Sequence, residues 1–170
     1  MSGPCRSPEE FQARSPWRTV RDEETGAAIL CPPTWQVLQH PGARIVLRCP
    51  VRRGVFAPNV VVTVERPDEP LASDIDAYSR EMLAGLRQTL TDLTVISDTP
   101  YIWYDLTGHH LLSAHRMGRY AVMLAQYWFL RDGLATVVSA SCDVSDHRRL
   151  DGDFDYMVAG LSLARRLPEE

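Results

Sequence analysis

Lysine is absent from this sequence: all eighteen basic residues of the 170-residue chain are arginines. A Walker A loop therefore cannot form, because its phosphate contacts need a lysine ammonium group. Enzymes that hold a substrate or pyridoxal phosphate as a lysine Schiff base are excluded for the same reason. Asparagine is nearly absent as well, with Asn59 as its single instance. We interpret this bias as high-GC coding, of the kind found in actinobacteria.

Paired cysteines of the metal-binding type are also lacking. Cys5, Cys31, Cys49 and Cys142 show no CxxC spacing and have no histidines at ligand distance in the sequence. We therefore expect no metal site and no cofactor. Scattered cysteines of this kind are typical of small buried residues with reduced thiols.

Long apolar runs are missing too. No stretch approaches the roughly 20 apolar residues of a membrane span, and no apolar signal segment begins the chain, so we expect a cytoplasmic protein that does not enter a membrane. The net charge of −4 argues against a basic nucleic-acid-binding surface. We predict a flexible tail over residues 1–17, which are rich in proline and serine, followed by a single domain over residues 18–167.

Two apolar segments on either side of Asp132 and Gly133 form the centre of the predicted fold. Asp-Gly suits a two-residue type I′ turn, because both central residues of that turn need positive φ. Such a turn places Tyr127 opposite Val138 in an antiparallel hairpin. Both sides of the two segments are largely apolar, which predicts a central position in a sheet that is covered on both sides.

Two amphipathic helices are predicted, one over residues 73–93 and the other over residues 146–165. Ser73 and Asp76 resemble a capping box at the start of the first helix. The apolar residues at helical spacing are Ile75, Tyr78, Met82, Leu86 and Leu90 in the first helix and Leu150, Phe154, Met157, Leu161 and Ala164 in the second. The predicted fold is α+β, a three-layer α/β/α sandwich with a twisted, mainly antiparallel sheet between two long helices.

Polar residues gather on one side of the predicted sheet. If Gly118 and Arg119 form a second two-residue turn, three adjacent strands share this side. The candidate binding residues on it are His109, Ser113, His115, Gln126, Trp128 and Ser139. A hydrolase would need a serine exposed on a strained turn, a base within reach and an oxyanion hole, and serines within strands provide none of these. We therefore expect binding at this side and no catalytic residue.

The order of elements and several short motifs resemble the LpqN/LpqT family of actinobacterial proteins, within the PsbP-like fold that includes DcrB-type proteins and the yeast Ran-binding Mog protein. The residues that match are Pro33 and Trp35, then Phe56, Pro58 and Asn59 before a valine strand, and Phe154 in the last helix. The resemblance covers about residues 20–167. It implies structural roles for these residues, a three-layer sandwich, and relatives that act as binding proteins.

The predicted function is that of a non-enzymatic adaptor or chaperone-like protein, which engages another protein through one side of its sheet. Whether it also forms a homodimer is left open. One alternative is a carrier of a small ligand or lipid, with Trp103 and Trp128 lining a cavity between sheet and helices. A serine hydrolase that uses the serines and histidines of the strands is the least favoured alternative.

Overall fold

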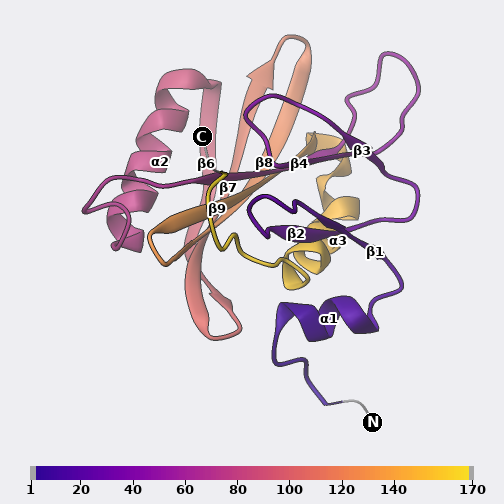
Figure 1. Ribbon diagram of the computed structural model, residues 1–170. Helices are drawn as coiled ribbons and strands as arrows, with labels where there is room; N and C mark the ends of the chain where they lie inside the picture. The colour runs from indigo at the N-terminus through magenta and orange to yellow at the C-terminus, as the bar shows by residue number, and fades with distance from the viewer. Residues whose placement is uncertain (1–2, 169–170) are drawn as a thin grey trace.

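The computed structural model describes residues 3–168, which form an α+β fold with one large antiparallel sheet and three α-helices (Figure 1). The helices are α1 (Pro8–Arg14), α2 (Ile75–Thr89) and α3 (His147–Ala159), with a short 3-10 helix, η1 (Val144–Asp146), before α3. The strands are β1 (Arg18–Arg21), β2 (Ala28–Cys31), β3 (Gln36–Leu38), β4 (Ile45–Arg48), β5 (Asn59–Glu65), β6 (Thr91–Trp103), β7 (Leu106–Met117), β8 (Tyr120–Arg131) and β9 (Leu134–Asp143). None of these helices combines the length and hydropathy that crossing a bilayer requires.

The large sheet has the strand order β3-β4-β5-β9-β8-β7-β6, and β1 and β2 pair separately. The hairpin of β8 and β9 lies at its centre, with Tyr127 opposite Val138, as the sequence predicts. Asp132 (φ 53°) and Gly133 (φ 73°) both adopt the left-handed conformation that a type I′ turn requires. The predicted central hairpin is therefore confirmed.

One side of this sheet, which we call the α3 side, carries the larger hydrophobic core. Tyr127 and Phe129 of β8 are fully buried there against Phe154 and Met157 of α3. The small β1-β2 sheet closes the same core through Ile29. Burial of each such large apolar side chain contributes about 1.5–3 kcal/mol, so this side holds the main hydrophobic stabilisation.

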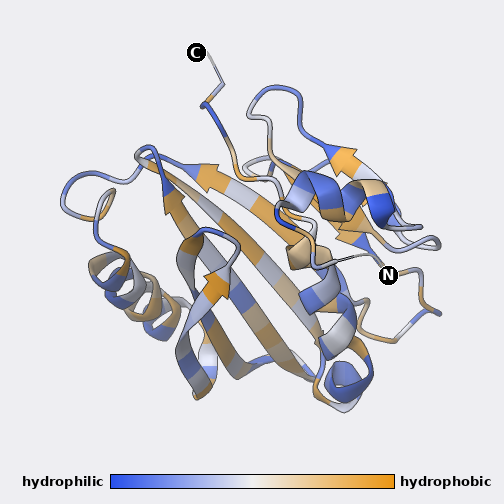
Figure 2. Cartoon of the chain, turned by 90° about the horizontal axis from the view of Figure 1, so that it is seen from below, coloured by the Kyte–Doolittle hydropathy of each residue, from blue (hydrophilic) through white to orange (hydrophobic). Residues whose placement is uncertain are grey.

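The opposite side, the α2 side, carries a smaller core in which Trp128 packs against Tyr78 of α2. Figure 2 shows hydrophobic and hydrophilic residues alternating along the strands, which is why the two sides of the sheet differ in polarity. Within α2, Tyr78 is the one buried residue, and Met82 and Leu86 stay half-buried. The predicted apolar stripe of this helix is thus only partly used for packing.

Helix α1 occupies part of the segment that the sequence predicts as a flexible tail over residues 1–17. Ser7 caps it, because its Oγ accepts a hydrogen bond from the Glu10 amide (3.1 Å), and Pro8 follows at the first helical position. Gln12 then ties the helix to the rest of the chain by donating to the Gly160 carbonyl (2.8 Å). The serine and proline that suggest disorder in the sequence act here as a helix start.

Helix α3 is shorter than the prediction of 146–165, because it ends at Ala159. Leu161 and Leu163 follow in an extended, buried segment instead of a further helical turn. Ser162 pairs with Ala28 of β2 through two backbone hydrogen bonds of 2.8 and 3.1 Å. The extended segment therefore completes the α3-side core, and the prediction of a long closing helix is wrong over its last third.

Helix α2 is also shorter at both ends than the predicted 73–93. Asp74 is its N-cap, and its carboxylate accepts the Asp76 amide (3.0 Å), so the proposed capping box at Ser73 is wrong. Ser73 instead donates to the Glu69 carboxylate (2.6 Å). The helix ends at Thr89 because β6 begins two residues later.

The motif residues that carry the family resemblance have structural positions. Trp35, Phe56, Pro58 and Phe154 are buried, whereas Pro33 is exposed. Asn59 opens β5, and its Nδ2 donates to the Ala57 carbonyl (3.1 Å). Phe56 packs edge-on against Tyr120, with 5.6 Å between ring centroids.

Candidate functional site

The strand registers place the predicted binding residues on the α2 side of the sheet. His109 of β7 lies opposite Trp128 of β8, and Gln126 of β8 lies opposite Ser139 of β9. Ser113 and His115 also belong to β7 and lie at even spacings from His109, so they face the same side. The register that brings the six residues to one side is confirmed, and their role in binding stays a prediction.

Two of the six residues, His109 and Trp128, stack on each other, and Trp128 also anchors α2 to the sheet. The His109 ring stacks on the Trp128 indole, with centroids 5.1 Å apart and an interplanar angle of 18°. The Nε2 of His109 also bonds the Asp98 carboxylate on β6. Trp128 Nε1 donates to Ser79 Oγ on α2 (2.8 Å). These polar atoms are therefore engaged within the chain.

Three polar atoms on the α2 side are buried without a hydrogen-bond partner among residues 3–168: Ser113 Oγ, His115 Nδ1 and Gln126 Oε1. The other end of Gln126 is bonded, since its Nε2 donates to Ser139 Oγ (3.0 Å). Burial lowers the pKa of His115, which favours the neutral imidazole. Because an unsatisfied buried polar group costs about 1–3 kcal/mol, this side of the sheet is not optimised for stability.

An apolar groove of about 460 Å³ runs along α2 beside the end of β5. The residues that line it are Glu65, Pro67, Asp68, Leu71, Tyr78, Glu81, Met82, Gly85, Leu86 and Thr89. The Tyr78 hydroxyl donates to the Glu65 carboxylate, and burial together with this carboxylate raises the pKa of Tyr78. Half-buried apolar side chains flanked by carboxylates can receive apolar side chains of another molecule.

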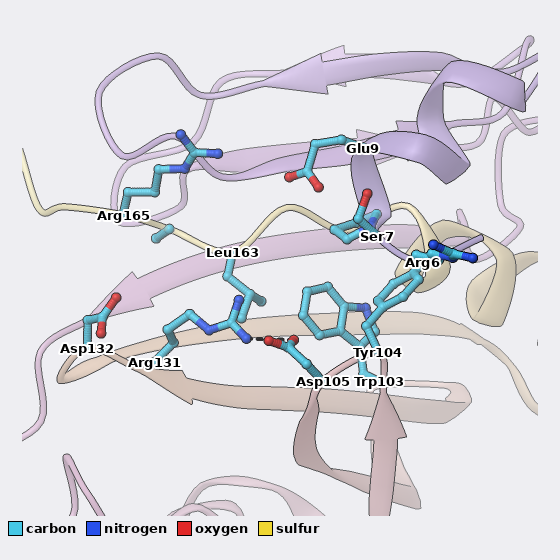
Figure 3. A pocket seen from close by; sticks show the side chains of 12 residues that line it. Arg6, Ser7, Glu9, Trp103, Tyr104, Asp105, Arg131, Asp132, Leu163 and Arg165 are labelled. Atoms are coloured by element: carbon cyan, nitrogen blue, oxygen red, sulfur yellow. Dashed lines mark hydrogen bonds and ion pairs between the residues drawn. The ribbon is translucent and has the colours of Figure 1, made fainter.

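Figure 3 shows a second, polar cleft of about 580 Å³. Side chains converge on it from the segment at α1, the β6–β7 turn, the β8–β9 turn and the C-terminal segment. Arg131 bonds Asp105 across it (2.8 Å), and Trp103 lies beneath, with its Nε1 donating to the Val158 carbonyl (3.0 Å). The remaining charged residues of the lining are Arg6, Arg165, Glu9 and Asp132, so positive and negative side chains balance.

The serines and histidines of the α2 side are not arranged as a nucleophile with its base. Ser139 Oγ accepts from Gln126, Ser113 is fully buried, and His109 is held by Asp98. A general base needs hydrogen-bond contact with the group it deprotonates. Among residues 3–168, no group of three or more histidine, cysteine or acidic side chains is placed to hold a metal ion.

The sequence pattern does not indicate the groove, because the helical spacing of Met82 and Leu86 predicts a core-facing stripe. A signal was present in Gly85, which interrupts a helix pattern where no turn is needed. Glu81 beside that stripe was a second indication, since a carboxylate there does not fit a fully buried helix face. The polar cleft assembles side chains from four distant segments, and no local pattern could have indicated it.

Comparisons with known proteins identify the fold. No protein-family model matches the sequence, and a sequence search of curated proteins finds no match. Among solved structures, LpqN of Mycobacterium tuberculosis, described as involved in cell envelope biogenesis, is similar with a TM-score of 0.65 and 11% identity, over 95% of this chain and 99% of that one. The cyanobacterial PsbP of Synechocystis sp. PCC 6803 is similar with a TM-score of 0.64 and 13% identity, over 86% of this chain and 91% of that one. The Ran-binding protein Mog1p of Saccharomyces cerevisiae is similar with a TM-score of 0.61 and 10% identity, over 86% of this chain and 94% of that one.

This chain has a PsbP-like fold. At these identities the similarity extends to the fold alone, and membership of the LpqN/LpqT family stays a prediction. The α2 side and its groove are therefore described from the residues of this chain.

Proposed function

We propose that this chain is a non-enzymatic adaptor or chaperone-like protein that binds another protein through the α2 side of its sheet.

We further propose a three-layer α/β/α sandwich, with α2 as one outer layer and α3 with the β1-β2 pair as the other, and a single domain over residues 18–167. It also includes membership of the LpqN/LpqT family and an actinobacterial source. We infer a cytoplasmic location from the four free cysteines, since thiols stay reduced there.

The observation that carries this proposal is the incomplete burial of α2. Met82, Leu83 and Leu86 are only half-buried, and Met82 and Leu86 line an apolar groove. Apolar side chains left partly open to water are typical of a surface that another molecule covers. The groove is lined by one helix, a strand end and the loop between them, which suits a protein segment.

The comparison with Mog1p supports the proposal by analogy. That protein has the same fold and is described as Ran-binding. A shared fold does not imply a shared partner, so the partner of this chain is left as another protein of unknown identity.

A second candidate function is the binding of a small polar molecule in the cleft of Figure 3. Trp103 lines that cleft, as the carrier hypothesis predicts, but its lining is charged instead of apolar. Trp128 lies fully buried under α2, away from this lining. Native mass spectrometry of the purified chain tests this candidate, because a bound molecule would appear as a defined mass increase.

The proposed function is tested by photo-crosslinking in the native cells. A benzophenone side chain replaces Met82 in the full chain, and a matched variant carries it at Arg148, which is exposed on α3. We expect a discrete crosslinked protein from position 82 and none from position 148. Equal crosslinking from both positions, or none from position 82, would contradict binding through the α2 side.

A further inference from the structure

We propose that the groove along α2 receives a basic amphipathic helix of the partner protein. This inference rests on the proposed function and names the chemistry of the segment that the α2 side would bind.

The floor of the groove is apolar. Leu71, Met82 and Leu86 contribute half-buried side chains, and the fully buried Tyr78 closes the bottom. The lining along α2 extends from Tyr78 to Thr89, which at 1.5 Å per residue is about 16 Å, or three helical turns. A partner segment of three turns would place apolar side chains along this floor at helical spacing.

The rim of the groove is acidic. Its charged residues are Glu65, Asp68 and Glu81, and no arginine lines it. The ion pairs formed among residues 3–168 involve other acidic residues, so these three carboxylates have no cationic partner in the described chain. An apolar floor between unpaired carboxylates is complementary to apolar side chains flanked by arginine or lysine.

Gly85 in the wall of the groove supplies an independent argument. It lies within α2, where glycine is unfavourable relative to alanine, and a Cβ atom at this position would meet nothing within 4 Å. Packing inside the chain therefore does not require glycine here. The absence of a side chain lets another backbone approach the helix closely, as a docked helix would do.

An extended peptide fits this place less well than a helix. Strand addition needs a free strand edge, but β5 pairs with β9 along its whole length and with β4 up to Val62, so only residues 63–65 leave an edge, which is too short to pair with a strand. A segment in the groove must therefore be held by its side chains. Helix-in-groove docking achieves this with anchors at i, i+3, i+4 and i+7.

Selection from a displayed library of random 16-residue peptides on the full chain tests the inference. We expect enriched peptides with apolar residues at helical spacing and an excess of arginine and lysine. Their affinity should fall at least tenfold in the Gly85→Leu variant, because the new side chain fills the groove. The matched Ala84→Leu variant adds the same side chain at an exposed neighbouring position outside the groove, and it should bind as the unmodified chain does.

Charge is tested separately. Glu81→Gln should weaken the selected peptides by about two- to fivefold, the effect of one exposed ion pair. Gln88→Arg changes the net charge equally from an exposed position on α2 outside the groove, and it should leave affinity unchanged within this range. Thermal melting serves as a folding control, because Gly85→Leu should melt no lower than the unmodified chain.

The inference is overturned if the enriched peptides are acidic or lack helical spacing, if none are enriched, or if Gly85→Leu binds them as well as Ala84→Leu does. Self-association abolished by Gly85→Leu would also overturn it, because the occupant would then be a second copy of this chain. These outcomes differ from failure of the proposed function, in which position 82 gives no crosslinked protein in cells.

Discussion

The two sides of the central sheet use their helices in different ways. Helix α3 buries Leu150, Phe154, Met157 and Val158, whereas α2, a longer helix, buries Tyr78 alone. Both helices carry an apolar stripe, so the difference lies in how much of each stripe the chain covers itself. The α3 side therefore buries the apolar stripe of its helix, and the α2 side leaves part of its stripe accessible to a partner.

Both sides of the sheet bury polar groups, and each side holds satisfied and unsatisfied ones. On the α3 side, Thr136 Oγ1 accepts the buried Ala164 amide (3.1 Å), and Tyr127 donates to Asp155 (2.7 Å). Within residues 3–168, Ser113 Oγ on the α2 side has no partner, and neither has His110 Nε2 on the α3 side. Satisfied polar groups stabilise a fold, whereas unsatisfied ones are tolerated where another requirement outweighs stability.

The largest expected difference comes from one substitution made on both helices. Met157→Ala on α3 removes a fully buried side chain and should lower the free energy of unfolding by about 2–5 kcal/mol. Met82→Ala on α2 removes a half-buried one and should cost about 1 kcal/mol or less. Urea denaturation of the two variants measures both values. Equal losses would show that α2 is packed as tightly as α3.

A smaller difference is expected from the polar groups. Thr136→Val leaves the buried Ala164 amide without a hydrogen-bond acceptor and should destabilise the chain by about 1–3 kcal/mol. Ser113→Ala removes an unpaired buried hydroxyl and should be neutral or stabilise by up to about 1 kcal/mol. Denaturant midpoints report both effects when the unfolding free energy depends on denaturant concentration with the same slope in each variant. A clear loss of stability in Ser113→Ala would mean that this hydroxyl is hydrogen-bonded in solution.

Acidic pH should weaken both sides through one histidine each. Burial lowers the pKa of His110 on the α3 side and of His115 on the α2 side below their ordinary value of about 6.5. The unfolded chain then binds protons that the folded chain excludes, so stability is complete above about pH 6.5 and falls as pH drops below it. Melting temperatures measured from pH 7.5 to 5 should depend less on pH in His110→Gln and in His115→Gln than in the unmodified chain. A profile that neither variant alters would contradict this assignment.

Much of the fold could be predicted from the sequence because its signals were local. Asp132 and Gly133 determine a turn type, and the turn determines the register of the hairpin and the side on which each residue lies. Errors arose where distant contacts decided the structure. The helical spacing predicts a last helix through residue 165, yet the helix ends at Ala159, and Ser162 pairs with the distant Ala28 of β2.

The candidate site was predictable only in part. Strand alternation placed His109 and Gln126 on the correct side, but it could not show that His109 is already held by Asp98. Helical spacing predicted the stripe that includes Met82, but it could not show how much of that stripe the sheet covers. Coverage depends on the angle and position of α2 over the sheet, which follow from the whole fold.

Amide hydrogen exchange of the full chain, read by mass spectrometry, tests most directly whether the α2 side is kept apart from the stable core. We predict that amides of residues 75–89 exchange through local opening, at a free energy clearly below that of global unfolding. Amides of residues 147–159 should exchange only with global unfolding. Equal protection of the two helices would contradict the division between a side for stability and a side for binding.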